Sequence, residues 1–113
     1  MAGKNHKREL FDGLIRIHVL LHASHEEIFG LAMMRELEHH GYRIGPGTLY
    51  PLLRGLEQAG LLRRAGQSGV GRRRLYRITA AGRKALARAR EKVDELYTEL
   101  HEARPRKMGK AAG

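Results

Sequence analysis

The segment 45–62, GPGTLYPLLRGLEQAGLL, constrains the fold of this chain more than any other part of its sequence. Apolar residues recur there at spacings of three and four, which is the pattern of a helix with one buried side. The predicted buried positions are Leu49, Leu52, Leu53, Leu56 and Ala59. A half-buried strand would alternate apolar and polar residues instead, so the segment predicts a helix that packs along one side.

The opposite side of this helix carries small, planar or hydrogen-bonding residues, none of them acidic: Gly47, Tyr50, Pro51, Arg54 and Gln58. Such a face is compatible with a phosphate-lined groove, although the segment taken alone fits an ordinary core helix equally well. Gly45 and Pro46 suit the helix start, because proline at the first position lacks only an N–H without an intrahelical partner. A start capped by Thr48 is the alternative; we favour the earlier start, with a local kink at Pro51.

Two more helices are predicted before this segment. The first has two apolar faces, typical of a helix covered on both sides; one comprises Leu10, Leu14, Ile17 and Leu21, and the other Phe11, Ile15, Val19 and His22. The second helix runs over about 29–40, and Gly41 is expected to end it in the left-handed conformation. Because the connection 41–45 is short, this helix and the next one predict a helix-turn-helix.

Two short strands are predicted over 61–65 and 72–79, because Tyr76 and Ile78 alternate with Leu75 and Arg77. Three glycines between the strands supply a flexible tip: Gly66, Gly69 and Gly71. Six arginines make this hairpin the most basic part of the chain: Arg63, Arg64, Arg72, Arg73, Arg74 and Arg77. Arginine donates to phosphate and a hairpin tip can enter a minor groove, so we favour DNA contact over a merely solvated edge strand.

A long C-terminal helix is predicted to begin after Thr79, which is its expected N-cap. Its apolar residues alternate spacings of three and four, as in a heptad seam: Leu86, Ala89, Val93, Leu96 and Leu100. This stripe is longer than the preceding elements need, so it is expected to meet the first helix or a second copy of the chain. We predict a two-fold homodimer whose interface includes Leu14, Ile15, Leu86, Val93, Leu96 and Leu100.

The charge of the chain favours a polyanionic partner, since 22 Lys and Arg against 12 Asp and Glu leave a formal net charge of +10 on 113 residues. The chain has no cysteine, which excludes disulfides, thiolate metal sites and cysteine nucleophiles. No apolar run has the length of a membrane span and no signal-peptide pattern opens the sequence, so we expect a cytoplasmic protein without membrane contact.

These observations predict an α+β, mainly helical fold: a winged helix-turn-helix with a two-stranded wing and a long C-terminal dimerisation helix. The expected organisation is a flexible basic arm over 1–8 and a DNA-binding domain over 9–79, followed by the dimerisation helix over 80–103. A disordered basic tail is expected over 104–113.

The chain resembles the PadR family of transcriptional regulators, in the short form with a single C-terminal helix. The resemblance covers nearly all of residues 10–100 and is carried by FGLAMMREL, TLYPLLRGLEQAGLL and RRRLYRITAAG. Its most specific part is the GTLYPLL run with an L-Y-R-I-T-x-x-G segment some two dozen residues later. The resemblance implies a dimer formed through the N-terminal and C-terminal helices. It also implies a repressor of nearby promoters, often including its own, that a small molecule or a stress signal releases.

Carried over residue by residue, the resemblance puts Thr48, Tyr50 and Arg54 on a recognition helix facing DNA. It puts Arg72, Arg73 and Arg74 on the wing, and it gives Gly82 a structural role that lets the last helix start close against the sheet. The chain departs from the family pattern at Gly45, where many relatives have a serine cap. It departs again at Phe29-Gly30, where glycine is commonly followed by tyrosine, here Leu31.

The candidate metal ligands are His18, His22 and His25, which lie at helical spacings near the end of the first helix. Two histidines four apart can share a metal ion, but this face offers no cysteine and no obvious carboxylate. We therefore favour partly buried or interfacial histidines and predict no metal or other cofactor. Metal sensing and a proton-linked role remain alternatives.

An enzyme is not expected, because the sequence has no phosphate-binding glycine loop, no nucleophile beside a base and no paired carboxylates with a pocket. The partners we expect are double-stranded DNA, a second copy of the chain and a possible small-molecule effector. An architectural or nonspecific nucleic-acid-binding protein is the main alternative. A module that binds an acidic protein is a third possibility.

Overall fold

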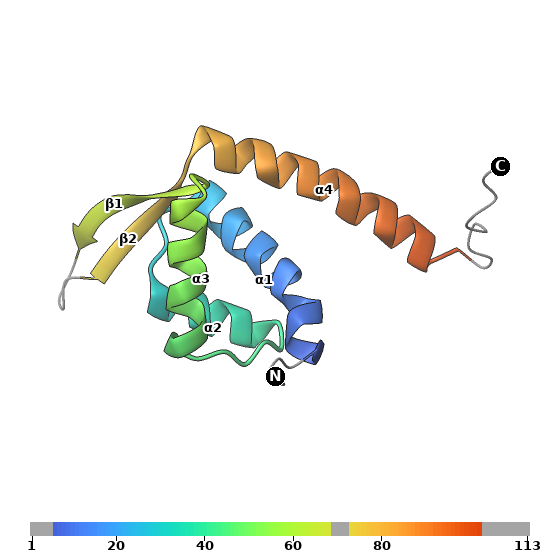
Figure 1. Ribbon diagram of the computed structural model, residues 1–113, viewed down its shortest axis with the longest axis horizontal. Helices are drawn as coiled ribbons and strands as arrows, with labels where there is room; N and C mark the ends of the chain where they lie inside the picture. Colours follow the sequence, from blue (N-terminus) through green and yellow to red (C-terminus); the bar gives the residue numbers. More distant parts are fainter. Residues whose placement is uncertain (1–5, 69–72, 103–113) are drawn as a thin grey trace.

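The computed structural model describes residues 6–68 and 73–102. The elements follow in the order α1 (His6–His25), α2 (Gly30–His39), α3 (Pro46–Gln58), β1 (Leu62–Ser68), β2 (Arg73–Ile78) and α4 (Ala80–Leu100). Figure 1 shows α1, α2 and α3 packed together, with the β1–β2 hairpin extending from one side and the C-terminal half of α4 projecting away. This arrangement confirms the predicted α+β, mainly helical winged helix-turn-helix.

The core lies among the three packed helices and the base of the hairpin. Its buried residues are Ile15, Val19, Leu20, Ala23, Ile28, Met33, Leu37, Leu49, Leu52, Leu53, Leu56, Leu62, Tyr76 and Ile78. The four leucines predicted on the buried side of α3 are all among them. Ala59 is not, because the helix ends at Gln58 and Ala59 is an exposed C-cap before Gly60, whose φ is +80°.

The turn between α2 and α3 has the predicted form. Gly41 has a φ of +88°, and its N–H donates to the carbonyl oxygen of Glu38 at 2.9 Å. Gly45 is the N-cap of α3, and its carbonyl oxygen accepts from the N–H groups of Thr48 and Leu49 at 3.1 and 3.0 Å. The early start at Pro46 is thereby confirmed, with Pro51 inside the helix.

The first helix differs from its prediction in length and in burial. It begins at His6 and so includes three residues that the sequence assigned to the basic arm; Glu9 in its first turn suits the positive end of the helix dipole. Only one side of α1 joins the core of the protomer. The other side leaves large apolar side chains exposed, namely Leu10, Leu14 and Leu21. Phe11, on the face of Ile15 and Val19, is 42% exposed and makes an edge contact with the ring of Tyr42. In a single protomer α1 is therefore covered on one side only, and cover of the other side stays a prediction that depends on the dimer.

The hairpin is longer than predicted on its first strand and is tied to the helices by a contact that the sequence pattern missed. The antiparallel register pairs Leu62 with Ile78 and shifts between Arg64 and Gly66, so Gly66 (φ +108°) lies within β1 and not at the tip. Gly69 and Gly71 lie outside the described residues. Ile28 forms a bridge with Tyr76, with N···O distances of 3.0 and 2.8 Å, which joins the wing to the segment before α2.

The start of α4 is fixed by the predicted cap. The Thr79 hydroxyl oxygen accepts from the N–H of Gly82 at 2.9 Å, and the hydroxyl donates to the carbonyl oxygen of Gly60 at 2.6 Å. Gly82 is buried, and a Cβ atom there would overlap the carbonyl oxygen of Leu61. The helix ends at Leu100, three residues before the predicted boundary, and residues 103–113 lie outside the described part.

Candidate nucleic-acid interface

The outer face of α3 is open to solvent in the way the sequence predicted. Its exposed residues are Gly47, Tyr50, Pro51, Arg54 and Gln58. Thr48 is half-buried at the start of the helix. The four buried leucines on the other side hold α3 against the core, so this face is presented by a rigid element and not by a loop.

Tyr50 also has a structural role that sequence reasoning missed. The side chain is 39% exposed, yet its ring lies over Gly30 at the start of α2: a Cβ atom on Gly30 would lie 2.5 Å from the Tyr50 Oη. Gly30 is buried under this ring. Gly30 therefore allows the Tyr50 ring of α3 to approach the start of α2 closely.

The arginines of the hairpin fall into two groups. Arg64 and Arg77 face carboxylates: Arg64 Nε lies 3.8 Å from Glu57 Oε1, and Arg77 pairs with Glu27. Arg63 and Arg74 are exposed. Arg73 begins β2, and Arg72 lies outside the described residues.

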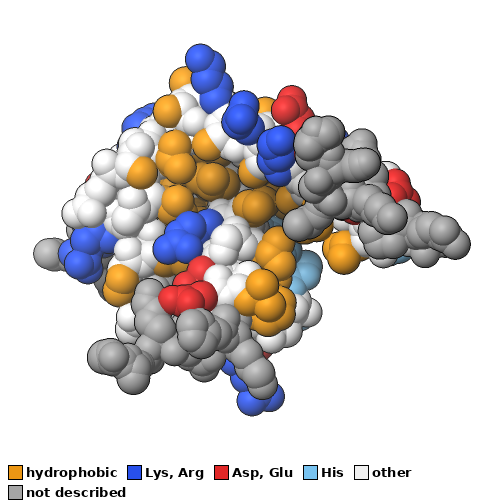
Figure 2. Space-filling view, turned by 45° about the vertical axis from the view of Figure 1, so that its right-hand side comes forward, with side chains coloured by type: hydrophobic (Ala, Val, Ile, Leu, Met, Phe, Trp, Pro, Cys, Tyr) orange, Lys and Arg blue, Asp and Glu red, His pale blue; other side chains and the backbone are white. Residues whose placement is uncertain are grey.

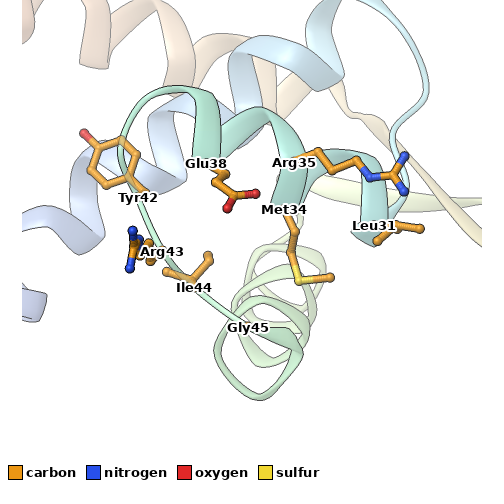
Figure 3. Close-up of a pocket in the computed structure, with 8 residues that line it drawn as sticks. All are labelled: Leu31, Met34, Arg35, Glu38, Tyr42, Arg43, Ile44 and Gly45. Atoms are coloured by element: carbon orange, nitrogen blue, oxygen red, sulfur yellow. The ribbon is translucent and has the colours of Figure 1, made fainter.

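Two further arginines line a pocket at the turn that leads into α3, and the sequence did not predict them as site residues. Arg35 of α2 and Arg43 of the turn line a pocket of about 590 Å³ together with Leu31, Met34, Glu38, Tyr42, Ile44 and Gly45. Figure 3 shows Met34 pointing toward α3 and Arg35 extending along α2 past Leu31. The helix N-terminus attracts anions, so cations here extend a surface suited to phosphate. The signal that could have found them is a basic residue on each side of the predicted turn.

A groove of about 820 Å³ lies between α1 and α4. Its apolar lining includes Ile17, Leu21, Leu86 and Val93, and its charged lining is Arg83, Arg90, Glu91 and Asp94. Figure 2 shows hydrophobic side chains gathered in the middle of one face, with Lys and Arg side chains around them.

The residues predicted for a dimer interface divide by burial. Leu14, Val93, Leu96 and Leu100 are exposed, and for Leu96 and Leu100 the exposed fractions reach 53% and 72%. Leu86 is half-buried and packs against the core. Ile15 is only 3% exposed, because it lies on the core side of α1 with Val19, so it offers little surface to a partner.

The structure groups the histidines differently from the prediction, which placed His18, His22 and His25 together on the first helix. His22 lies with Glu36 and His40 of α2, and one potential ligand atom from each falls within 4.8 Å of the others. The sequence missed this carboxylate because it comes from the neighbouring helix, although Glu36 and His40 are four residues apart there. His25 is exposed and is not one of the three.

His18 is next to this group, since its ring stacks on the ring of His40 with centroids 4.6 Å apart. Burial lowers the pKa of His18 below its ordinary value of 6.5. The neighbouring His40 and His22 lower this pKa further, and Glu36 acts in the opposite direction. His18 is therefore more often neutral than a free histidine at the same pH.

Within residues 6–68 and 73–102, no helix combines the length and the apolar character needed to cross a membrane.

Comparison with known proteins confirms the resemblance seen in the sequence. A family model described as "Transcriptional regulator PadR-like family" matches residues 19–88. The chain is 46% identical over 94 residues to a protein named "Transcriptional regulator Rv3488" from Mycobacterium tuberculosis, covering 82% of this chain and 88% of that protein.

Two solved structures have the same fold. A PadR family transcriptional regulator from Eggerthella lenta aligns with a TM-score of 0.71 at 33% identity, over 85% of this chain and 88% of that one. The protein smu.1704 from Streptococcus mutans aligns with a TM-score of 0.77 at 29% identity, over 85% of this chain and 93% of that one.

Proposed function

This chain belongs to the PadR-like family of transcriptional regulators, and on that premise we propose that it is a dimeric, sequence-specific DNA-binding repressor. The family comprises transcriptional regulators and not enzymes. The observation that carries the proposal is the exposed face of α3, which has no acidic residue and lies on a helix held by four buried leucines.

We place α3 in the major groove of DNA, the position of the second helix in helix-turn-helix proteins. Tyr50 and Arg54 then face base edges, and Thr48, at the start of α3, lies near the sugar-phosphate backbone of the DNA. The wing contributes Arg72, Arg73 and Arg74, which we assign to phosphate or minor-groove contacts beside that groove. The formal net charge of +10 supports this placement, because phosphate neutralisation supplies much of the affinity for DNA.

The proposed dimer forms through α1 and α4. Leu14 on α1 and Val93, Leu96 and Leu100 on α4 expose apolar surface that a second copy would cover. A two-fold dimer of this kind would present two copies of α3 to half-sites about 34 Å apart, one turn of DNA. The groove between α1 and α4 lies next to this interface. A ligand bound there could change the separation of the two recognition helices, and it would thereby release the repressor.

Selection from a random-duplex library, followed by fluorescence anisotropy, tests this function. The enriched sequence and a shuffled duplex of equal composition are titrated at several salt concentrations. A sequence-specific regulator binds the enriched duplex at least about a thousandfold more tightly, and a clear preference persists at physiological salt. An architectural protein gives no enriched motif and equal affinities that fall together as salt rises. That outcome would replace the proposal with the architectural alternative.

A further inference from the structure

Three side chains from two helices converge on a single point beside the helix-turn-helix. His22 comes from α1, and Glu36 and His40 come from α2. The Nε2 atoms of His22 and His40 lie 3.6 and 3.5 Å from the same carboxylate oxygen, Oε2 of Glu36. We refer to these three residues as the α1–α2 cluster.

The ligand set of the α1–α2 cluster suits a transition-metal ion. Two imidazole nitrogens and one carboxylate oxygen are the protein ligands of an open zinc site, which keeps its fourth position for water or another ligand. Zn–ligand bonds of about 2.0–2.1 Å place tetrahedral neighbours about 3.3 Å apart. The two histidine–glutamate separations of 3.6 and 3.5 Å need to shorten only slightly, and the two histidine nitrogens, which lie within 4.8 Å of each other, need to approach by at most about 1.5 Å. The three side chains are between 28% and 45% exposed, which leaves an entry path for an ion.

We propose that His22, Glu36 and His40 bind one divalent transition-metal ion per protomer, with Zn²⁺ as the best match, and that this ion is an effector of the regulator, acting at a site separate from the α1–α4 groove. The second step rests on the proposed function, whereas the binding step does not. The absence of cysteine makes the site a nitrogen and oxygen site, selective against metals that require thiolates.

The position of the site explains how metal binding would affect the DNA-binding surface. α1 carries exposed apolar residues of the proposed dimer interface, and α2 supports α3 through the turn. A bound ion would fix these two helices against each other. His40 stacks on His18, whose ring makes an edge contact with Tyr42 in the turn, with centroids 5.5 Å apart. A movement of the His40 ring would therefore displace the rings of His18 and Tyr42, and Tyr42 lies in the turn that leads into α3.

An ion pair without metal is the competing explanation, because protonated histidines would also be attracted to Glu36. The two explanations differ in metal stoichiometry and in the response of matched variants. His39 is an exposed histidine next to His40 but outside the cluster, and His25 is an exposed histidine on α1. His39→Gln and His25→Gln are thus controls for His40→Gln and His22→Gln.

The binding step is tested with chelator-treated, full-length protein in the absence of DNA. Titration with Co²⁺, followed by visible absorption and by competition with Zn²⁺, should give one ion per protomer. His22→Gln, Glu36→Gln and His40→Gln should each weaken Zn²⁺ at least tenfold, while His39→Gln and His25→Gln keep wild-type affinity. Circular dichroism of the metal-free variants checks that each is folded. No stoichiometric binding, or equal losses in His39→Gln and His40→Gln, would overturn the site.

The effector step is tested by measuring affinity for the selected duplex with and without Zn²⁺. We expect the wild-type affinity to change at least fivefold on adding Zn²⁺, and that of His40→Gln to stay constant. Stoichiometric Zn²⁺ binding with no change in DNA affinity would overturn the effector role alone. If neither the metal-free nor the metal-loaded protein prefers any duplex, the proposed function is contradicted. The metal site is not affected by that result, because metal binding is measured without DNA.

Discussion

A single missing Cβ atom lets α4 begin against the end of the helix-turn-helix. At Gly82 an added Cβ would overlap the backbone oxygen of Leu61 and lie 2.7 Å from Cγ1 of Ile78. Backbone cannot give way as an exposed side chain can, so Gly82→Ala should reduce the free energy of unfolding by about 1–3 kcal/mol. Urea denaturation at fixed protein concentration measures the change.

Gly55→Ala is the matched control for Gly82→Ala. Gly55 is an exposed residue inside α3 with no atom within 4 Å of its Cβ position. Alanine there should stabilise the protein by up to about 1 kcal/mol, because glycine is a poor helix former. If the two substitutions changed stability by the same amount, the close approach of α4 at Gly82 would not be what requires glycine.

Arg54 and Arg74 should affect DNA binding in different ways. Arg54 lies on the exposed face of α3, so Arg54→Ala should cost about 1–3 kcal/mol on the selected duplex and little on a shuffled one. Arg74 is exposed on β2, so Arg74→Ala should weaken both duplexes alike and reduce the salt dependence. Anisotropy titrations on both duplexes measure the difference. Equal losses from Arg54→Ala on both duplexes would contradict base contact by α3.

At the scale of elements, the cap of α4 is the clearest local device. The Thr79 hydroxyl accepts from Gly82 N–H and donates to the Gly60 carbonyl, so it joins two elements. Thr79→Ala should lower the free energy of unfolding by about 1–2 kcal/mol, since both hydrogen bonds are lost. Thr79→Ser keeps the hydroxyl and should cost much less. Thermal or urea unfolding of the two variants checks this, and equal losses would show that the hydroxyl is not the cause.

Elements set by local chemistry were predictable from the sequence. The Gly45-Pro46 start of α3, the left-handed Gly41 and the Thr79 cap all depend on residues within one turn, and all were confirmed. The spacing of the leucines was sufficient to identify the buried side of α3 because the helix is short and one-sided.

Contacts between distant segments were not predictable. The ring of Tyr50 over Gly30 and the bridge from Ile28 to Tyr76 join residues 20 or more positions apart, and no periodicity encodes such pairs. The same limit applies to Ile15, which the protomer buries although the sequence pattern placed it in an interface. Both faces of α1 are apolar, and only the packing decides which one the protomer buries. The α1–α2 cluster was not predictable from the histidine spacing on α1, because Glu36 and His40 come from α2.

For the molecule as a whole, DNA binding at two half-sites requires a dimer in which the exposed seam of α4 packs against that of a second copy. Leu96 is 53% exposed in the protomer, so Leu96→Glu should give a folded monomer at micromolar concentration by placing a charge in the interface. Thr98→Glu adds the same charge at an exposed position off the seam and should leave the dimer intact. Analytical ultracentrifugation distinguishes these states. A wild-type protein that sediments as a monomer would contradict the dimer.

In the proposed dimer, the two copies of α3 lie one turn of DNA apart. Methylation interference on the selected duplex tests it most directly, because methylation of guanine N7 blocks contacts in the major groove. A dimer with α3 in successive major grooves predicts interference at two symmetric half-sites about 10 base pairs apart on one side of the DNA. Interference that is absent, or spread evenly along the duplex, would contradict docking through α3.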